Sequence, residues 1–382
     1  MQRVMIVIYG SLFVRCDQRD RQRQRSTINA VGVDMEVTKA LVDEADIFNK
    51  ITQIRTPTES YARKYPVIVE LANQQLEEKL WFSSEMKVEL DKLNLKFKLE
   101  PHQLHAVKTV LQLFLKYELI VGEEFWMGKV VRTFPRPEVK LAASILCMME
   151  LAVHAEFYNQ INVVLGMDTD ADYVAYKDDP ELMGRMDWLE SVLGDEDDVL
   201  SVIIFSLTET ALLFSSFAIL KSFQCNGYND IPVIARGANQ SAVDEDLHGV
   251  VSAEIINQYY AEIGRPLSED TRRVEKIRQA IDHVYAHECR IVDMAIPGGE
   301  LNGESAENYK AFVRYRLNVW CRRLGLEDHF ENDDTPIKDW FEMNTYAYKM
   351  IDFFTPGMGM EYELGWDEEE LAKAWEEELK YE

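Results

Sequence analysis

Residues 149–158 have the sequence Met-Glu-Leu-Ala-Val-His-Ala-Glu-Phe-Tyr, an apolar stretch that carries a carboxylate, an imidazole and a phenol. Glu150 and His154 are four residues apart, and so are His154 and Tyr158. The three side chains therefore follow one face of a predicted helix. Polar groups inside a buried helix are costly unless something pairs with them. A metal ion is one such partner, which makes this stretch a candidate metal site.

Residues 243–248 supply a second carboxylate and imidazole. Glu245 and His248 are three residues apart, again on one helical face. Two other apolar helices carry a lone carboxylate each, Glu118 and Glu209. The order along the chain is a lone Glu, a Glu with a His, a lone Glu, and a Glu with a His. A four-helix bundle that binds two iron or manganese ions requires this set of ligands, because carboxylates can bridge two metals and imidazole adds nitrogen ligands.

Each carboxylate also has an ordinary structural explanation. A lone Glu in a helix usually lies on a solvated face, and a single Glu–His pair often arises by chance. Glu209 is different, because apolar residues surround it and Lys221 is the basic neighbour in its own helix. A metal-free helical interaction protein, in which Lys or Arg would pair with the carboxylates, therefore fits this sequence less well.

The remaining histidines lack such a carboxylate set. We predict them at the surface or in local hydrogen bonds: His102, His105, His283, His287 and His329. His283 and His287 are four residues apart, but their stretch is the more polar one.

The composition excludes several classes of protein. The chain has 382 residues, with 67 acidic and 41 basic side chains and a net charge of −26. Phosphate backbones bind surfaces rich in Lys and Arg, so a nucleic acid is not expected as the main partner. Five scattered cysteines without a Cys-x-x-Cys pair predict reduced thiols in the cytoplasm. No apolar run of about eighteen residues stands out, so no membrane span is expected. Residues 1–10 are apolar but lack a signal-peptide cleavage site.

Few prolines and glycines, eleven and eighteen, favour long helices. The apolar periodicity and helix signals predict helices over most of the chain, at 74–91, 101–118, 138–165, 199–225, 238–264, 270–296 and 306–324. The last helix carries a basic stripe of Lys310, Arg314, Arg316, Arg322 and Arg323. Alternation typical of a strand is weak and confined to residues 3–9. The fold is therefore predicted to be all-α.

Three segments are predicted along the chain. Residues 1–30 are predicted to be a flexible extension, because the run 15–25 is rich in Arg, Gln and Asp. Residues 31–350 form the helical di-metal domain. Residues 351–382 form a flexible acidic tail.

Taken together, these motifs resemble the small, radical-generating subunit of class I ribonucleotide reductase, in its phage and bacterial branch. The similarity extends roughly from Trp81 to the C-terminus. Four motifs carry it: Tyr-Glu-Leu-Ile-Val-Gly-Glu-Glu at 117–124, Glu-Leu-Ala-Val-His-Ala-Glu-Phe-Tyr at 150–158, Thr-Glu-Thr-Ala-Leu-Leu-Phe-Ser-Ser-Phe-Ala at 208–218, and Asp-Glu-Asp-Leu-His at 244–248. Residues 298–303 and 334–340 resemble later landmarks of the family.

The resemblance implies a ferritin-like bundle in which two metal ions activate oxygen. The ions are two irons, manganese with iron, or two manganese ions. The implied metal ligands are Glu118, Glu150, His154, Glu209, Glu245 and His248. Tyr158 would be oxidised to the radical, with Phe217 in the apolar pocket around it. Ser241 makes that pocket less apolar than a radical requires.

The resemblance also implies a path by which the radical leaves. Trp81 would begin this path, and Asp244 would link it to His154. A tyrosine of the tail would end it, either Tyr362 or its competitor Tyr381. The C-terminus would dock on the large catalytic subunit, which reduces ribonucleotides to deoxyribonucleotides. A homodimer and a cytoplasmic location, in the host cytoplasm if the chain is phage-encoded, are implied as well.

The chain departs from the family pattern at its first pair. Family members usually space that Glu and His three residues apart, whereas Glu150 and His154 are four apart. A π-bulge near residues 151–153 would restore their approach. Glu156 is a poor substitute, because it points roughly 160° away from His154 on a regular helix.

Two alternatives stay open. Glu118 stands where many family members have Asp, and Glu123 and Glu124 compete for that assignment. The alternative function is another oxygen-activating di-metal oxidase that acts directly on a substrate. Such an oxidase would use the same ligands but would need neither Trp81 nor a tail tyrosine.

Overall fold

The computed structural model describes residues 47–351, with side chains for all of these except Leu113 and residues 344–351. The chain divides into a unit Met1–Ile51 and a larger unit Thr52–Glu382. The long helices and the candidate site belong to the larger unit.

Several predictions concern residues outside this range. The extension 1–30, the strand candidate at 3–9, and the tail with Tyr362 and Tyr381 all lie outside the described residues. The three-segment organisation therefore stays a prediction.

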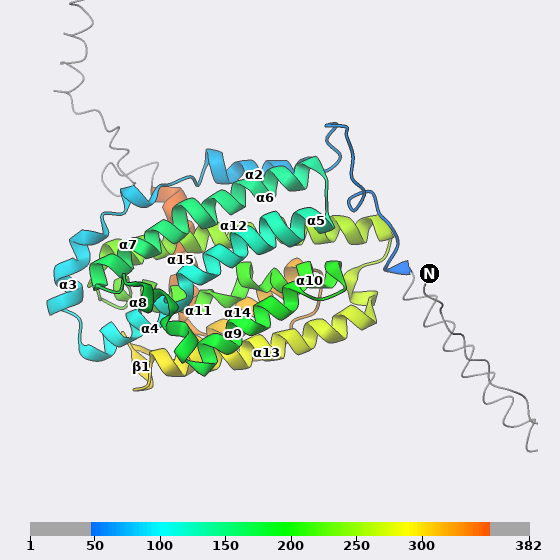
Figure 1. Cartoon of the computed structure of the whole chain (residues 1–382). Helices are drawn as coiled ribbons and strands as arrows, with labels where there is room; N and C mark the ends of the chain where they lie inside the picture. Colours follow the sequence, from blue (N-terminus) through cyan, green and yellow to red (C-terminus); the bar gives the residue numbers. More distant parts are fainter. Residues whose placement is uncertain (1–46, 352–382) are drawn as a thin grey trace, which may run out of the picture. The chain divides into compact units, whose positions relative to one another are not determined.

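Helices dominate the larger unit, as predicted (Figure 1). In chain order they are α2 (Pro66–Glu77), η1 (Ser83–Glu85), η2 (Val88–Asp91), α3 (Lys92–Phe97), α4 (Pro101–Leu119), η3 (Ile120–Val130), α5 (Val131–Thr133), α6 (Pro137–Met148), η4 (Met149–His154), α7 (Ala155–Leu165), α8 (Asp170–Val174), η5 (Ala175–Asp178), α9 (Pro180–Leu193), α10 (Asp198–Phe205), η6 (Thr208–Leu212), α11 (Phe214–Lys221), η7 (Ser222–Gln224), α12 (Pro232–Ile263), η8 (Leu267–Glu269), α13 (Thr271–Ala295), α14 (Ala306–Arg323) and α15 (Pro336–Ile351). The strands β1 (Glu300–Leu301) and β2 (Glu304–Ser305) pair as a short antiparallel hairpin.

Prolines begin several of these helices. Pro66, Pro101 and Pro232 occupy the first turn of α2, α4 and α12, where a missing N–H costs nothing and the fixed φ suits the helix. The helix predicted over 74–91 is wrong, because α2 begins at Pro66 and ends at Glu77, and loops and 3₁₀ turns follow. The helix predicted from residue 238 begins six residues earlier, at Pro232, because a proline is favoured in the first turn of a helix.

Three of the ligand-bearing stretches contain or adjoin a π-helical segment. Glu118 is followed by η3, Glu150 and His154 lie within η4, and Glu209 lies within η6. The bulge expected near residues 151–153 is therefore confirmed. Within this π-helical segment Glu150 and His154 lie on one side of the helix, and His154 Nδ1 is 3.1 Å from Glu150 Oε2.

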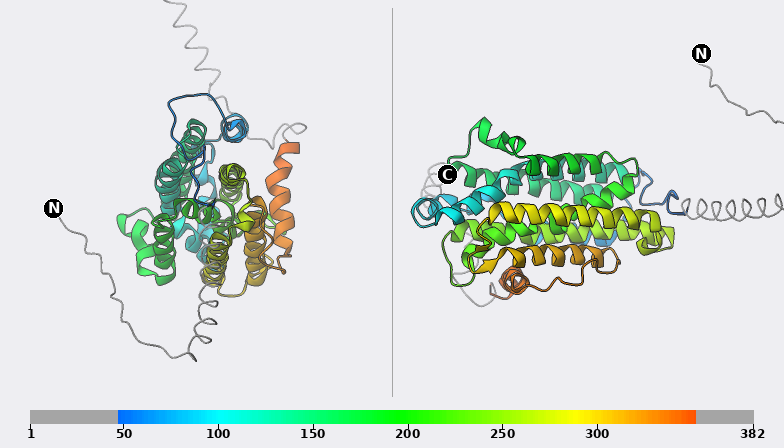
Figure 2. Two further views of the ribbon diagram at one scale, coloured as in Figure 1. Left: turned by 90° about the vertical axis from the view of Figure 1, so that its right-hand side faces the viewer. Right: turned by 90° about the horizontal axis from the view of Figure 1, so that it is seen from below.

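The long helices run side by side (Figure 1). α2 packs on α6 and α12, α4 packs on α7 and α13, and α11 packs on α12 and α14. α15 crosses the other long helices and packs on α14 and α12 (Figure 2). The interior between these helices is lined by apolar and aromatic side chains, and the ligand-bearing segments face it.

Two described helices have the length and composition of a membrane span, Pro137–Leu165 and Asp198–Gln224. The most apolar window of Asp198–Gln224 is 94% buried within the fold. Its apolar character is therefore that of a central core helix, which also explains why Glu209 has apolar neighbours on every side.

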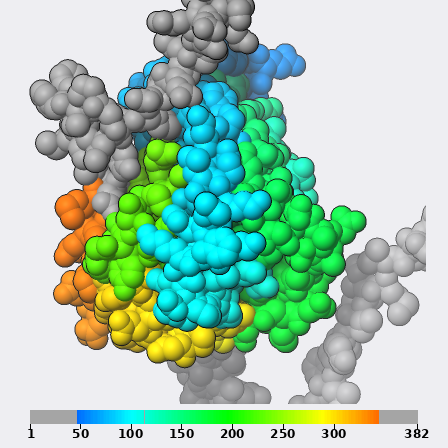
Figure 3. Space-filling view, turned by 90° about the vertical axis from the view of Figure 1, so that its left-hand side faces the viewer, coloured from blue at the N-terminus to red at the C-terminus, as the bar shows by residue number. Residues whose placement is uncertain are grey.

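The segment from η1 to α3 lies at the surface, on the end of the unit seen in Figure 3. Its Leu90, Leu93 and Phe97 are 66%, 68% and 73% exposed, whereas Leu95 is buried. Met86 and Val88 of the same segment are buried too, so the segment contributes apolar side chains to the core as well as exposing others.

Candidate metal centre

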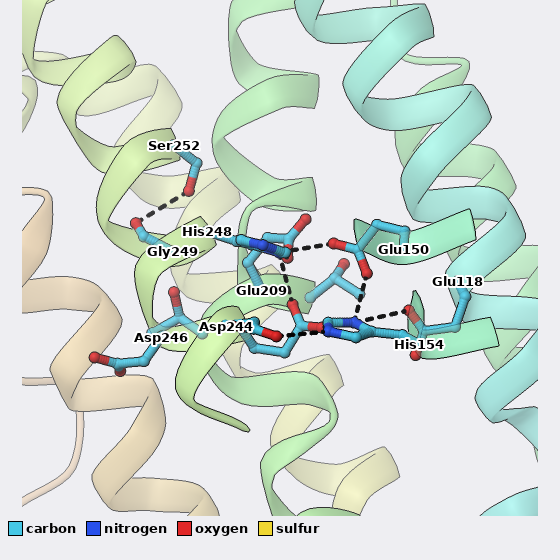
Figure 4. Close-up of polar contacts among 12 residues, drawn as sticks. Glu118, Glu150, His154, Glu209, Asp244, Asp246, His248, Gly249 and Ser252 are labelled. Atoms are coloured by element: carbon cyan, nitrogen blue, oxygen red, sulfur yellow. Dashed lines mark hydrogen bonds and ion pairs between the residues drawn. The ribbon is translucent and has the colours of Figure 1, made fainter. Parts of the chain in front are cut away.

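The six predicted ligands come together in the interior of the helical unit. Figure 4 labels all of them except Glu245. They lie on four stretches of chain, and each is at most 2% exposed: Glu118 at the end of α4, Glu150 and His154 in η4, Glu209 in η6, and Glu245 and His248 in α12. The competing residues Glu123, Glu124 and Glu156 are exposed. Glu118 is thus the carboxylate of its stretch that faces the cluster.

The six side chains form two groups of four. One group contains Glu118, Glu150, His154 and Glu245, and the other contains Glu150, Glu209, Glu245 and His248. Within each group, one potential ligand atom from every residue lies within 4.8 Å of those of the other members. Glu150 and Glu245 belong to both groups. This sharing is the arrangement in which two carboxylates bridge a pair of metal ions.

The Nδ1 atoms of both histidines face the carboxylates. His154 Nδ1 is 3.1 Å from Glu150 Oε2 and 3.1 Å from Glu245 Oε1. His248 Nδ1 is 2.7 Å from Glu150 Oε1 and 3.3 Å from Glu245 Oε2. The two rings are nearly parallel, with centroids 6.1 Å apart. Each imidazole therefore offers one nitrogen to its own group of carboxylates.

Cations bound within this cluster would stabilise its buried negative charges. Burial raises the pKa of Glu118 and of Glu209, and neighbouring carboxylates add to the effect. Burial alone would also raise the pKa of Glu245, but His248 and His154 outweigh it and lower that pKa. Glu118 Oε1 and Glu209 Oε1 accept no hydrogen bond from the described residues.

Four buried carboxylates match the charge of two divalent ions, and their oxygens with two imidazole nitrogens suit iron or manganese. The residues therefore fit a dinuclear metal centre.

A hydrogen-bonded chain supports the first histidine from behind. His154 Nε2 lies 3.0 Å from Asp244 Oδ2, and Trp81 Nε1 donates to the same oxygen at 2.7 Å. Gln75 Nε2 donates to the other oxygen of Asp244 at 2.9 Å. The expected link from Trp81 through Asp244 to His154 is thus present. Gln75 was not predicted, since nothing in its local sequence indicates a partner 169 positions away.

Tyr158 lies in an aromatic pocket and is fully buried. Its ring stacks on Phe114 with centroids 4.3 Å apart, and Phe217 contacts Phe114 in turn at 5.4 Å. Burial and then the charge of Glu118 raise the pKa of this phenol, while the Ser241 hydroxyl acts in the opposite direction. Tyr158 Oη makes no hydrogen bond with the described residues. The pocket therefore shields the phenol and holds it neutral.

The surroundings of Trp126 and the burial of His287 were not anticipated from the sequence. Trp126 in η3 is buried, and its ring meets His248 edge-on at 6.4 Å, a neighbour that sequence reasoning missed. His287 was predicted at the surface or in a local hydrogen bond, but it is 4% exposed and its ring nitrogens have no hydrogen-bond partner among the described residues. That prediction is wrong because α13 turns this side of the helix toward the core. His283 stacks on Trp188.

The described part of the chain thus combines a bundle of long helices with six buried ligands in two groups that share two carboxylates. Fold and site together define a ferritin-like di-metal carboxylate protein. A family model described as ribonucleotide reductase, small chain, matches residues 59–336. The chain belongs to this family, and the predicted resemblance, fold class and small-subunit function are confirmed.

Solved structures share the fold at low sequence identity. The dimanganese(II) NrdF of Streptococcus sanguinis is 18% identical with a TM-score of 0.65, and the match covers 76% of this chain and 99% of that one. The R2 subunit from Clostridium botulinum is 18% identical with a TM-score of 0.64, covering 75% and 91%. The Rnr4 homodimer from Saccharomyces cerevisiae is 16% identical with a TM-score of 0.65, covering 84% and 99%. A search of curated proteins gives no match.

Proposed function

We propose that this chain uses a dinuclear metal centre to generate a radical on Tyr158 and passes that radical to a large ribonucleotide reductase subunit. The observation that carries the proposal is the pair of four-residue groups that share Glu150 and Glu245. The metal ions are two irons, manganese with iron, or two manganese ions. The dimanganese(II) form of the similar Streptococcus protein supports the last of these.

The ligands and the phenol have separate tasks. When bound, and after oxidation by dioxygen or an oxidant derived from it, the two metal ions would supply the oxidising power that removes one electron from a nearby phenol. The phenol loses its proton together with the electron, because a neutral tyrosyl radical needs no buried charge. After burial itself, the charge of Glu118 contributes most to raising the pKa of Tyr158, so the neutral phenol is the favoured form before oxidation. Phe114 and Phe157 line the pocket and exclude water from the oxidised ring.

The radical would leave through the hydrogen-bonded chain on the other side of the centre. Trp81, Asp244 and His154 are joined by contacts of 2.7 and 3.0 Å, short enough to couple electron and proton movement. The path would end at Tyr362, with Tyr381 as the competitor, and the C-terminal tail would bind the large subunit.

The assembly is a homodimer in this proposal, supported by the homodimeric structure of the similar yeast protein. The chain would work in the cytoplasm, where thiols such as its scattered cysteines stay reduced.

A direct oxidase is the alternative, and the structure gives it less support. Such an enzyme has no need for a buried indole that donates to a carboxylate behind a metal-ligating histidine. Trp81 is fully buried and has that contact. The family match adds to the weight of the reductase.

The proposal is tested by metal loading followed by electron paramagnetic resonance. Chelator-treated protein is loaded with iron(II) or manganese(II) and then oxidised, and its metal content is measured. We expect about two ions per chain and a tyrosyl signal that Tyr158→Phe removes. The matched control is Tyr309→Phe, which alters another buried tyrosine whose hydroxyl also lacks a hydrogen bond with the described residues. A signal that survives Tyr158→Phe, or a protein that takes up no metal, contradicts the proposal.

A further inference from the structure

Two arginines of the basic stripe on α14 turn inward. Arg316 is 4% exposed, and the side chain of Arg323 is 17% exposed. Arg322 in contrast lies at the surface, where it pairs with Asp328. The inward arginines meet Asp246, which directly follows Glu245 in α12. Figure 4 shows that Asp246 points to the side of α12 opposite the carboxylate cluster.

Arg316 joins two ligand-bearing segments. Its Nη2 donates to Asp246 Oδ1 at 2.8 Å, and its Nε donates to the carbonyl oxygen of Thr210 at 2.9 Å. Thr210 directly follows Glu209 in the π-helical segment η6. A single planar guanidinium therefore holds the residue after Glu245 and the residue after Glu209 at a fixed separation.

Neighbouring contacts hold this guanidinium in place. It lies over the ring of Phe214, 3.6 Å from the centroid. Arg323 Nη2 donates to the same Asp246 oxygen at 2.6 Å. A Cβ added at Gly249 would lie 2.3 Å from Thr210 Oγ1 and 2.6 Å from Arg323 Nη1. Glycine at this position therefore permits the close approach of α12, η6 and α14.

The two halves of the centre have different support. His154 is held from behind by Asp244, whereas His248 Nε2 has no hydrogen-bond partner among the described residues. Metal-ligating histidines ordinarily gain orientation from such a partner. The group with His248 lacks that support, and the contacts of Arg316 reach this group through Thr210, beside Glu209.

We propose that Arg316 is a positioning residue that fixes Glu209 against Glu245 and thereby sets the metal affinity of the group Glu150, Glu209, Glu245 and His248. The proposal rests on the metal binding proposed above. Glu245 belongs to both groups, but the other group keeps Glu118 and the Asp244-supported His154. Loss of Arg316 therefore weakens one metal position far more than the other.

The test is a titration of chelator-treated full-length protein with manganese(II). Binding is measured by isothermal titration calorimetry and by the electron paramagnetic resonance signal of free manganese(II). For Arg316→Gln, we expect one ion to bind as in the wild type and the second to bind roughly 10- to 100-fold more weakly. In Arg316→Lys, the affinity for the second ion should lie between those of the wild type and Arg316→Gln. An ammonium group can keep the pairing with Asp246, but it lacks the forked guanidinium that also reaches Thr210. Arg322→Gln is the control on the same helix and should bind both ions as the wild type does.

Two results overturn the proposal: equal affinities at both positions in Arg316→Gln, and an equal loss at both positions. If Arg316→Gln does not fold, as judged by circular dichroism, Asp246→Asn decides. It should weaken the same single position, and unchanged binding refutes the idea. A wild-type protein that binds no manganese(II) or other divalent ion defeats the proposed function itself, so the two failures are distinguishable.

Discussion

Replacement of Asp244 by alanine should cost far more stability than its size suggests. Its carboxylate receives three contacts from buried partners: Trp81 Nε1 at 2.7 Å, Gln75 Nε2 at 2.9 Å and His154 Nε2 at 3.0 Å. Asp244 itself is 1% exposed. Water therefore does not replace the lost acceptor, and the three groups stay desolvated.

The magnitude follows from these contacts. A hydrogen bond to a charged group contributes about 1.5–3 kcal/mol, but contacts that share one acceptor are not additive. Removal of one member of a buried charged network costs about 3–5 kcal/mol. We expect Asp244→Ala to lower the free energy of unfolding by about this amount. The measurement is urea unfolding with a chelator present, so that metal binding does not contribute to the difference.

Asp282→Ala is the matched control for Asp244→Ala. Asp282 also contacts a histidine, His329 Nε2 at 2.8 Å, but its side chain is 67% exposed. An exposed pair of this kind contributes about 1 kcal/mol or less. If Asp244→Ala loses no more stability than Asp282→Ala, the carboxylate is not a structural hub and the reasoning from burial fails.

Three further predictions concern other parts of the chain. Gly237→Ala should destabilise the fold by about 1–3 kcal/mol, because the new Cβ would lie 2.2 Å from Phe157 Cζ. Gly184→Ala in α9 should stabilise the fold slightly, because its new Cβ meets open space. The urea midpoint should therefore fall in the first variant and rise slightly in the second. Burial lowers the pKa of His287 to about 4, below the ordinary value of 6.5, so the unfolded chain binds the proton more readily between these values. Stability should therefore fall as the pH drops from 6.5 to 4, and a His287→Gln variant with the same pH dependence would contradict this. At a concentration a hundredfold above its dissociation constant, manganese(II) should stabilise the native state by about 2.7 kcal/mol and so raise the midpoint of thermal unfolding. A chelator should reverse this rise. An unchanged midpoint would argue against a metal site in the native state.

Local patterns in the sequence predicted the fold class, which is confirmed, and the six side chains that the structure brings together. Glu150 and His154, like Glu245 and His248, lie within one or two turns of each other, so helical periodicity alone places each pair on one face. The resemblance to the family, not periodicity, indicated that a four-residue spacing is unusual at this pair and that a π-helical turn would restore the approach of the two side chains. Glu209 stood out because its own helix is apolar on every side, which only a buried ligand or an ion pair explains.

Local patterns failed where chain geometry is set by proline or by distant packing. A proline can begin a helix as well as end one, and Pro66 starts α2 eight residues before the helix predicted from residue 74. His287 lies on a helix of mixed character, and only the packing of α13 against its neighbours shows that this side is buried.

The sequence by itself indicated the candidate metal ligands, apart from the choice among Glu118, Glu123 and Glu124, because ligand chemistry and helical periodicity are properties of short stretches. Only the tertiary structure decided how these stretches meet: that Glu150 and Glu245 are shared by two groups, that Gln75 holds Asp244, and that Arg316 joins the segments of Glu209 and Glu245. These contacts connect residues separated by 70 to 169 positions. No short pattern encodes such pairs, since they follow from the packing of whole helices.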